Sequence, residues 1–364
     1  MTRLARATVD LSAIRHNLAV AAARAPDSRV IAVLKANGYG HGLVQAARAV
    51  SAADALAVSC LEEAMPLREA GFGHRLVLLE GPFEASELGV YERLRLDPVV
   101  HAPWQIELLQ RRRPRRNLDV WLKVDTGMHR LGFPPGSIGD IHARLANCPG
   151  IGSIRIMTHL ACADDRRDAT TTEQLEVLRR ACDGLGAERS VCNSAGTLGW
   201  PSAHADWVRP GIMLYGASPF IDGGERPPLR AAMTLEARLI AVNRHRRGDR
   251  VGYSGTYECP EDMPVGVVSI GYGDGYPRHA PNGTPVLVNG EPAELVGRVS
   301  MDMICVDLRR CPDAAVGDPV VLWGPDLPAE SIAERCGTIA YELFCQITRR
   351  VAYRYVDGAE YGED

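Results

Sequence analysis

The sequence predicts an α/β protein built from an N-terminal (β/α)8 TIM-like barrel and a C-terminal, mainly antiparallel β domain. Over roughly the first 220 residues, eight short apolar runs alternate with segments of helical periodicity. This alternation is typical of βαβ units, and eight units favour a closed barrel. A Gly- and Pro-rich segment at 218–230 follows, and β-branched runs separated by turns come after it. We therefore expect the barrel at residues 8–228 and the β domain at residues 229–364.

The barrel elements can be read in order along the chain. The segment "DLSAIRHNLAVAAARA" predicts a helix that begins before the first strand, with Ser12 as its N-cap. An open, doubly wound sheet is the alternative architecture, because periodicity alone does not distinguish it from a barrel. The expected strands are "RVIAVLKAN" (29–37), "ALAVSC" (55–60), "RLVLLEG" (75–81), "LDPVVHA" (96–102), "DVWLKVDTG" (119–127), "IGSIRIMTHL" (151–160), "RSVCNSAG" (189–196) and "DWVRPGIMLYG" (206–216).

The last third of the chain has a different pattern. Its β-branched runs include "LEARLIAVNRH", "VGVVSIGYG", "TPVLVNGEPAELVG", "SMDMICVDL", "DPVVLWG" and "VAYRYV". Only "AESIAERCG" and "AYELFCQI" have helical spacing. Short strands separated by turns are typical of antiparallel sheets.

Composition narrows the class of protein. The 364 residues carry a formal net charge of −4, which gives no general attraction to nucleic acid or to membranes. The basic run "RRRPRRN" (111–117) is interpreted as a helix C-terminus and a solvated loop, because no aromatic residues are interspersed. The ten cysteines form no C-x-x-C pair and are typical of reduced thiols in a cytoplasmic protein. The N-terminus shows no apolar signal-peptide core, and no run approaches about 18 apolar residues.

Polar side chains follow five of the eight expected strands. In a parallel barrel the C-terminal strand ends meet at one rim, where catalytic groups collect. Taken singly, these residues have ordinary explanations: a lysine extending its charge to solvent, or a hydrogen-bonded structural histidine. The residues are Lys35, Lys123 with Asp125 and Arg130, His159, Asn193 with Ser194, and Arg209.

The scarcity of lysine favours a chemical role at this rim. The chain has two lysines, Lys35 and Lys123, against 39 arginines. Arginine stays protonated, whereas a desolvated lysine can attack a carbonyl to form a Schiff base, or take up carbon dioxide as a carbamate. This chemistry indicates either a carbonyl substrate or pyridoxal phosphate (PLP). Ser194 and the amides near Gly211 and Ile212 follow the last two strands, the usual phosphate position in barrels.

Nine motifs, in their order along the chain, resemble those of alanine racemases over about residues 5 to 350. They are "VLKANGYGHG", "LKVDTGMHRLG", "THLACADD", "CNSAGTL", "VRPGIMLYG", "VGYSGTY", "SIGYGDGY", "GRVSMD" and "TIAYE". The resemblance implies the barrel, a β domain that includes the first few N-terminal residues, PLP, an amino-acid substrate, and a head-to-tail homodimer with shared active sites.

The resemblance also implies roles for individual residues. Lys35 would hold PLP as a Schiff base and act as the base on the D-alanine face, and Tyr253 of the partner subunit would be the opposite base. Arg209 would face the pyridine nitrogen, backed by His159. The phosphate would contact Tyr39, Ser194, Gly211, Ile212 and Tyr341, with Asn193 nearby in the cofactor site. Arg130 would contact the cofactor and the substrate, next to a carbamylated Lys123. Tyr272 and Met301, both of the partner subunit, would contact the substrate.

Some features depart from the family pattern or leave alternatives open. Ser300 stands where cysteine is frequent, His129 where a smaller residue is frequent, and "RRVAYRY" lacks a common proline. A broad-specificity racemase, acting for example on serine or basic amino acids, is one alternative. A decarboxylase of this fold would need a Gly-rich phosphate motif and a C-terminal catalytic cysteine in matching contexts, and a non-catalytic PLP carrier would resemble the barrel alone. Supply of D-alanine to the cell wall and alanine catabolism are both compatible with the motifs.

Overall fold

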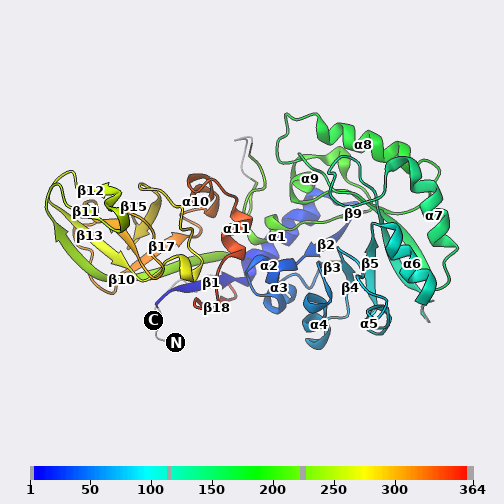
Figure 1. Cartoon of the computed structure of the whole chain (residues 1–364), viewed down its shortest axis with the longest axis horizontal. Coiled ribbons are helices and arrows are strands. Elements are labelled where there is room, and N and C mark those ends of the chain that lie inside the picture. Colours follow the sequence, from blue (N-terminus) through cyan, green and yellow to red (C-terminus); the bar gives the residue numbers. More distant parts are fainter. Residues whose placement is uncertain (1–3, 113–115, 222–226, 359–364) are drawn as a thin grey trace.

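The computed structural model describes residues 4–112, 116–221 and 227–358, and it contains a closed barrel beside an eight-stranded sheet (Figure 1). The barrel order β2-β3-β4-β5-β6-β7-β8-β9 confirms the predicted TIM-like architecture and excludes the open doubly wound sheet. The last barrel strand ends at Val208, and the first long strand of the sheet begins at Met233. The domain boundary between 228 and 229 stays a prediction.

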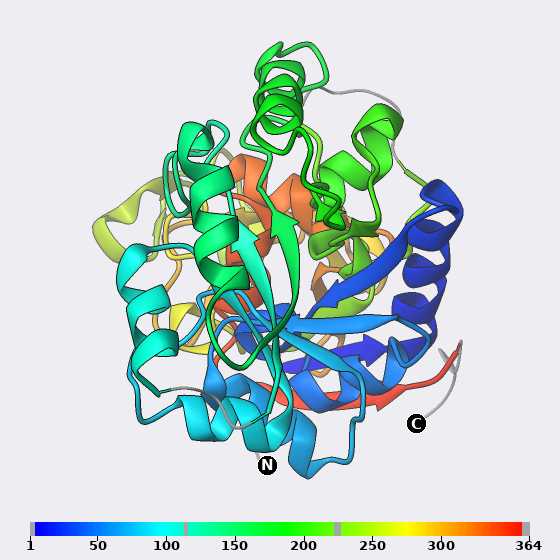
Figure 2. The ribbon, with the colours of Figure 1, turned by 90° about the vertical axis from the view of Figure 1, so that its right-hand side faces the viewer.

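All eight predicted barrel strands are present, and each is shorter than its apolar run. For example, the run 29–37 contains a strand of only five residues, because the chain turns after Val33. Helices surround the strands when the barrel is viewed from the side away from the sheet (Figure 2). The strands are β2 (Arg29–Val33), β3 (Ala55–Val58), β4 (Arg75–Leu78), β5 (Leu96–Val100), β6 (Leu118–Lys123), β7 (Ile151–Met157), β8 (Arg189–Ser190) and β9 (Trp207–Val208).

The helices between these strands pack apolar faces onto the barrel. Helix α6 ends at Arg112, as the basic run predicts, although residues 113–115 of that run lie outside the described residues. Within the described ranges, no helix has both the length and the apolar content to span a membrane. The helices are α1 (Leu11–Arg24), α2 (Lys35–Tyr39), α3 (Leu43–Ala49), α4 (Leu61–Glu69), α5 (Leu88–Leu94), α6 (Pro103–Arg112), α7 (Ile138–Ala146), α8 (Thr170–Ala181) and α9 (Ser194–Gly199).

The predicted cap of the first helix is wrong by two residues. Asp10, not Ser12, is the N-cap of α1, and its carboxylate accepts hydrogen bonds from the backbone N–H of Ser12 at 2.8 Å and of Ala13 at 3.3 Å. The Ser12 hydroxyl also donates to Asp10 at 2.7 Å. A carboxylate at this position accepts these bonds with the added strength of its charge, which explains why the serine is displaced into the first turn.

The second region is a mainly antiparallel sheet with the strand order β13-β16-β15-β14-β17-β10-β1-β18. Its strand β1 (Arg6–Asp10) comes from the N-terminus and pairs antiparallel with β10 and parallel with β18. The two predicted helices are present as α10 (Ala329–Arg335) and α11 (Ala340–Cys345). The remaining strands are β10 (Met233–His245), β13 (Met263–Val268), β14 (Pro285–Val288), β15 (Glu291–Val296), β16 (Ile304–Asp307), β17 (Pro319–Trp323) and β18 (Ala352–Val356), with a separate hairpin of β11 (Arg250–Val251) and β12 (Tyr257–Glu258).

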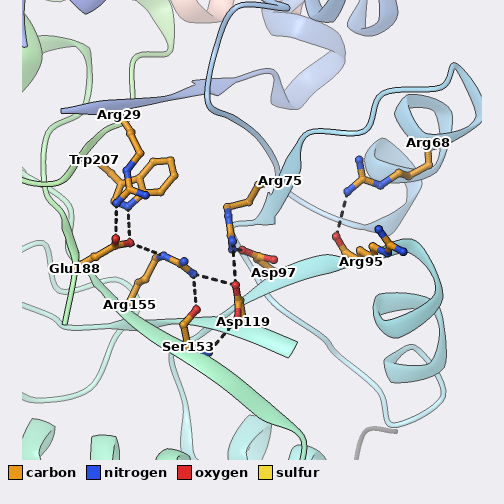
Figure 3. Close-up of polar contacts among 10 residues, drawn as sticks. All are labelled: Arg29, Arg68, Arg75, Arg95, Asp97, Asp119, Ser153, Arg155, Glu188 and Trp207. Carbon is orange, nitrogen blue, oxygen red and sulfur yellow. Dashed lines mark hydrogen bonds and ion pairs between the residues drawn. The ribbon is translucent and has the colours of Figure 1, made fainter. Parts of the chain in front are cut away.

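A chain of ion pairs links the strands at the N-terminal end of the barrel (Figure 3). Glu188 joins Arg29 to Arg155, and Asp119 joins Arg155 to Arg75, which also pairs with Asp97. Although burial opposes it, the hydrogen bonds from Arg29, Trp207 and Arg155 lower the pKa of Glu188 to about 2. Alternating positive and negative side chains on several strands at this end indicate a structural role, since the catalytic groups of barrels lie at the opposite rim.

We predict that Arg155→Met destabilises the protein by roughly 2–3 kcal/mol, because it leaves Asp119 of β6 and Glu188, just before β8, without their shared partner. The side chain of Arg155 is only 11% exposed. Arg179→Met is the matched control: Arg179 bonds Glu176 at 2.8 Å, but its side chain is 65% exposed, so the change should be within about 0.5 kcal/mol. Urea unfolding of both variants measures the difference, and equal effects would contradict the role of the chain of ion pairs.

Candidate active site

The sequence predicts that Lys35 ends a strand, but the structure shows otherwise. Lys35 lies two residues after β2 and begins α2, which is a tight left-handed turn. The next residues have left-handed backbone dihedrals: φ is 53° at Ala36, 57° at Asn37 and 51° at Tyr39. For residues with a Cβ atom this conformation costs roughly 1–2 kcal/mol each. The turn therefore needs specific contacts to hold it, and its geometry fixes where Lys35 begins.

Contacts from both regions of the protein hold this turn. Asn37 Oδ1 accepts from the Leu43 N–H at 2.9 Å, and the Tyr353 hydroxyl, from β18, donates to the Gly40 carbonyl at 2.8 Å. Glu63, in α4, accepts from the Ala36 N–H at 2.6 Å. Glu63 is not among the predicted site residues. Its position, an acidic residue in the first turn of the helix after a barrel strand, was the feature of the sequence that could have indicated it.

Cationic side chains gather around the barrel mouth. Burial, together with the nearby charges of Arg209, Lys123, Arg130 and Lys35, lowers the pKa of the half-buried His159 well below the usual 6.5. His159 is therefore a neutral hydrogen-bonding group. Burial, with Arg209, Arg130 and Lys35, also lowers the pKa of Lys123 to about 8. The rim thus has an excess of positive charge and a histidine that adds none.

Arg209 is buried without a carboxylate partner among the described residues. Its Nη1 donates to the Ser190 hydroxyl at 2.7 Å and its Nη2 to the Thr158 carbonyl at 2.7 Å, while His159 Nδ1 lies 3.4 Å from Nη2. Burial lowers the pKa of Arg209 to about 10, so the guanidinium stays charged at neutral pH. No described residue accepts from its Nε–H, which leaves one directed donor for a ligand.

Next to this cation, Ser194, Tyr39 and the segment after β9 form a cradle of donors. Ser194 Oγ accepts from the Gly211 N–H at 2.8 Å and the Met213 N–H at 3.3 Å. Within the described part of the chain, the Ser194 and Tyr39 hydroxyls and the Ile212 N–H donate to no protein group. Burial raises the pKa of the Tyr39 phenol, so it stays protonated as a donor.

Shape and aromatic packing support this cradle. A Cβ atom on Gly211 would lie 2.4 Å from the Tyr39 hydroxyl, so only glycine fits there. The Tyr39 ring packs 4.9 Å from that of Tyr215 and 5.9 Å from that of Tyr341, as centroid distances. Asn193 caps α9 by accepting from the Gly196 N–H at 2.9 Å, which places Ser194. Open donors, a lysine and a free cationic donor fit the phosphate, aldehyde and ring nitrogen of PLP.

Three predicted site residues lie elsewhere, on the surface of the sheet region. Tyr253 is 69% exposed, Met301 52% and Tyr272 38%. Tyr272 and Met301 are neighbours, because the Tyr272 N–H donates to the Ser300 carbonyl and the Gly273 N–H to the Met301 carbonyl. Tyr253 lies between β11 and β12, at the end of the sheet remote from the barrel (Figure 1). Within the single chain, Tyr253 is therefore not brought to Lys35.

The departures noted in the sequence lie at the edges of the site. His129 has a φ of 54°, and its Nδ1 lies 3.2 Å from Asp125 Oδ2. Asp125 also accepts from the His129 N–H at 2.9 Å. Arg130, next in the chain, is exposed. The histidine thus stabilises the loop that presents Arg130 without entering the cradle.

Comparisons with known proteins agree along nearly the whole chain. The family models "Alanine racemase, N-terminal domain" and "Alanine racemase, C-terminal domain" match residues 9–219 and 232–355. An alanine racemase of Halorhodospira halophila is 56% identical over 98% of this chain and 99% of its own, and one of Nitrosococcus oceani is 53% identical over 95% and 98%.

Solved structures give the same result. The biosynthetic alanine racemase of Pseudomonas aeruginosa superposes with a TM-score of 0.95 at 48% identity, covering 98% of this chain and 100% of that one. An alanine racemase of Bartonella henselae with covalently bound pyridoxal phosphate has a TM-score of 0.88 at 30% identity, covering 97% and 99%.

We predict that Gly211→Ala weakens PLP binding by about tenfold or more, because the new methyl group displaces the Tyr39 hydroxyl from the cradle. The backbone of Gly211 has a φ of −119°, which is not the left-handed conformation that favours glycine. Gly139→Ala, where an added Cβ meets open space, is the control. Titration of the cofactor-free chain with PLP measures the affinity. Unchanged affinity in Gly211→Ala would contradict the assignment of the cradle.

Proposed function

Because this chain belongs to the alanine racemase family and is a PLP-dependent isomerase that interconverts L-alanine and D-alanine, we propose that its two bases are Lys35 and Tyr253 of the partner subunit. The observation that carries the proposal is the separation of these groups within one chain. Lys35 lies at the C-terminal rim of the barrel, and the 69% exposed Tyr253 lies at the remote end of the sheet.

Racemisation requires that a proton leaves Cα on one face and returns on the other. PLP, when bound, supplies an electron sink for the negative charge left at Cα. The Lys35 amine holds the cofactor and exchanges the proton on the D-alanine face. The phenol of Tyr253 of the partner subunit exchanges it on the L-alanine face. General acid–base catalysis of this kind contributes about 10²–10⁴-fold each.

The remaining residues bind and orient. Tyr39, Ser194 and the Ile212 N–H donate to the phosphate, and Gly211, whose N–H is bonded to Ser194, lines the site. Tyr341 adds a phenol that burial keeps protonated by raising its pKa. Asn193 supports this cradle through its cap on α9. Arg209 directs its free Nε–H to the ring nitrogen and retains its own proton, with neutral His159 as a neighbour. A ring that is not protonated withdraws less charge from Cα, which should limit side reactions.

The substrate carboxylate is bound from two sides. Arg130 approaches from the barrel rim, where its charge acts on His159 and Lys123. Tyr272 of the partner subunit and Met301 of the partner subunit close the entrance from the other chain. In the single chain both residues are exposed beside the equally exposed Met303, at 42%. An apolar surface of this kind is typical of an interface, which supports a head-to-tail homodimer.

We further propose a biosynthetic role in the cytoplasm, supplying D-alanine for peptidoglycan. The structural neighbour from Pseudomonas aeruginosa, at 48% identity, is described as biosynthetic. The ten cysteines are all free thiols, as expected in a reducing compartment. Growth of a D-alanine-requiring bacterium that expresses this chain, without added D-alanine, tests the role.

Mixing two inactive variants tests the shared active site. Lys35→Ala and Tyr253→Phe should each lose racemisation. Random exchange of their subunits makes half of the dimers mixed, and each mixed dimer has one site with both bases, so about a quarter of the wild-type activity should return. The assay follows alanine racemisation with added PLP, before and after subunit exchange.

Two controls define this experiment. A mixture of Lys35→Ala with the double variant Lys35→Ala/Tyr253→Phe should stay inactive, because no site then contains a lysine. Full activity of Tyr253→Phe alone would remove the two-base assignment. Absence of recovery despite proven exchange would show that the tyrosine acts within its own chain. The same assay with a panel of amino acids measures substrate breadth.

We propose that Lys123 carries a carbamate that positions Arg130. With a pKa of about 8, roughly a quarter of the amine is neutral at pH 7.5, against about one part in a thousand for an ordinary lysine. A neutral amine adds to carbon dioxide and releases one proton, and the resulting anion offsets the surrounding cations. Occupancy should therefore fall as the pH decreases below about 7, where the amine is protonated.

This prediction is checked by 13C NMR in bicarbonate labelled with 13C. A carbamate signal should be present in the wild-type chain and absent in Lys123→Met. Lys123→Glu, which restores a negative charge, should retain more activity than Lys123→Met, whose kcat/KM should fall roughly tenfold. Wild-type activity of Lys123→Met, or a signal that persists in it, would contradict the proposal.

A further inference from the structure

Glu63 uses its carboxylate to bind the ends of two neighbouring barrel strands. It lies in the first turn of α4, and its Oε2 accepts from the Ser59 N–H, just after β3, at 2.8 Å. Its Oε1 accepts from the Ala36 N–H at 2.6 Å. Among the residues that the structure describes, no arginine or lysine lies within 4.0 Å of this carboxylate. Both carboxylate oxygens therefore accept hydrogen bonds from backbone N–H groups.

The bond to Ala36 acts directly on Lys35. The N–H of Ala36 belongs to the same rigid peptide unit as the carbonyl of Lys35. Fixing the direction of this N–H therefore fixes the ψ dihedral of Lys35, and with it the direction in which the lysine side chain leaves the backbone. Ala36 is also the first left-handed residue of the turn, with a φ of 53°.

No other described group binds the Ala36 N–H. Other bonds of the turn hold other atoms: the Gly38 N–H donates to the Leu34 carbonyl at 2.7 Å, and the Gly40 N–H donates to the Ala36 carbonyl at 2.9 Å. Hydrogen bonds to an ionised acceptor are about twice as strong as neutral ones. Removal of the carboxylate would leave the Ala36 N–H without a described acceptor.

We propose that Glu63 is a positioning residue for Lys35: its carboxylate orients the peptide unit between Lys35 and Ala36, and so directs the amine toward the cofactor and Cα. The proposal rests on the role assigned to Lys35 above. It predicts a loss in the rate of catalysis and in retention of PLP, whereas a purely structural contact would change stability alone.

The variants are Glu63→Ala, which removes both acceptors, and Glu63→Gln, which keeps one carbonyl oxygen and cannot satisfy both N–H groups. Glu62→Gln is the matched control, because Glu62 is exposed in the same helical turn. We expect kcat to fall roughly 10- to 100-fold in Glu63→Ala and less in Glu63→Gln, with KM changed less than about threefold. PLP should dissociate faster in the same order, as measured by loss of its absorbance after gel filtration.

A second readout observes Lys35 without catalysis. Because the chain contains two lysines, labelling lysine with 13C at Cε gives one signal from each. In the full chain before PLP is added, Glu63→Gln should shift or broaden the Lys35 signal and leave the Lys123 signal in place. Glu62→Gln should change neither signal.

The outcomes separate the two proposals. Lower thermal stability in Glu63→Ala with wild-type kcat, PLP release and Lys35 signal would overturn the positioning role and leave Glu63 as a structural contact. Lys35→Ala is measured in parallel. If that variant still racemises alanine, the role of Lys35 itself fails. If it is inactive while both Glu63 variants behave as wild type, only the positioning role fails.

Discussion

The left-handed turn that follows β2 is the constraint on which the arrangement of the protein depends. It places three residues with Cβ atoms, Ala36, Asn37 and Tyr39, in a backbone region that such residues seldom adopt. A turn of this cost persists only where the surroundings hold it. Glu63 holds its start from the barrel, and Tyr353 holds its end from the sheet. A Cβ on Gly40 would lie 2.0 Å from the Phe344 carbonyl, so α11 packs directly on the turn. The lysine, the cradle tyrosine and the contact between the two regions are therefore one structural unit.

Buried and half-buried arginines are paired with carboxylates at one end of the barrel and with neutral acceptors at the other. At the N-terminal end, Glu188 and Asp119 alternate with arginines, and Arg29, Arg75 and Arg155 each have a carboxylate partner (Figure 3). At the C-terminal rim, Arg209 is buried against neutral acceptors only, among the described residues. Burying a cation without a counter-ion costs free energy unless a ligand supplies a negative charge or a hydrogen-bond acceptor. The first arrangement stabilises the barrel, and the second leaves a cation suited to an anionic cofactor or substrate.

The sequence predicted the order of the elements and the closed barrel, for reasons that also explain its failures. Apolar runs report burial, and Leu34, just after β2, is buried too, so Lys35 was placed inside a strand that ends at Val33. Scarcity of lysine singled out Lys35 and Lys123 because it reflects chemistry and not packing. Glu63 was missed because a backbone hydrogen bond across two strand ends leaves no pattern in one dimension. The neutral state of His159 also needed the fold, because it depends on cations from several strands.

The same geometry explains why one chain is insufficient for a two-base reaction. The groups on a barrel rim share one direction, because parallel strands all end at the same face. Lys35 and the cradle therefore approach a bound ring from the barrel side, and the opposite face of Cα stays open. The sheet region of the same chain does not close it, since Tyr253 lies at the end remote from the barrel. On the proposed assignment, only a second copy can present a phenol to that face. Formation of the dimer is then part of the catalytic site, and it buries the exposed Tyr253 and Met301 at the same time.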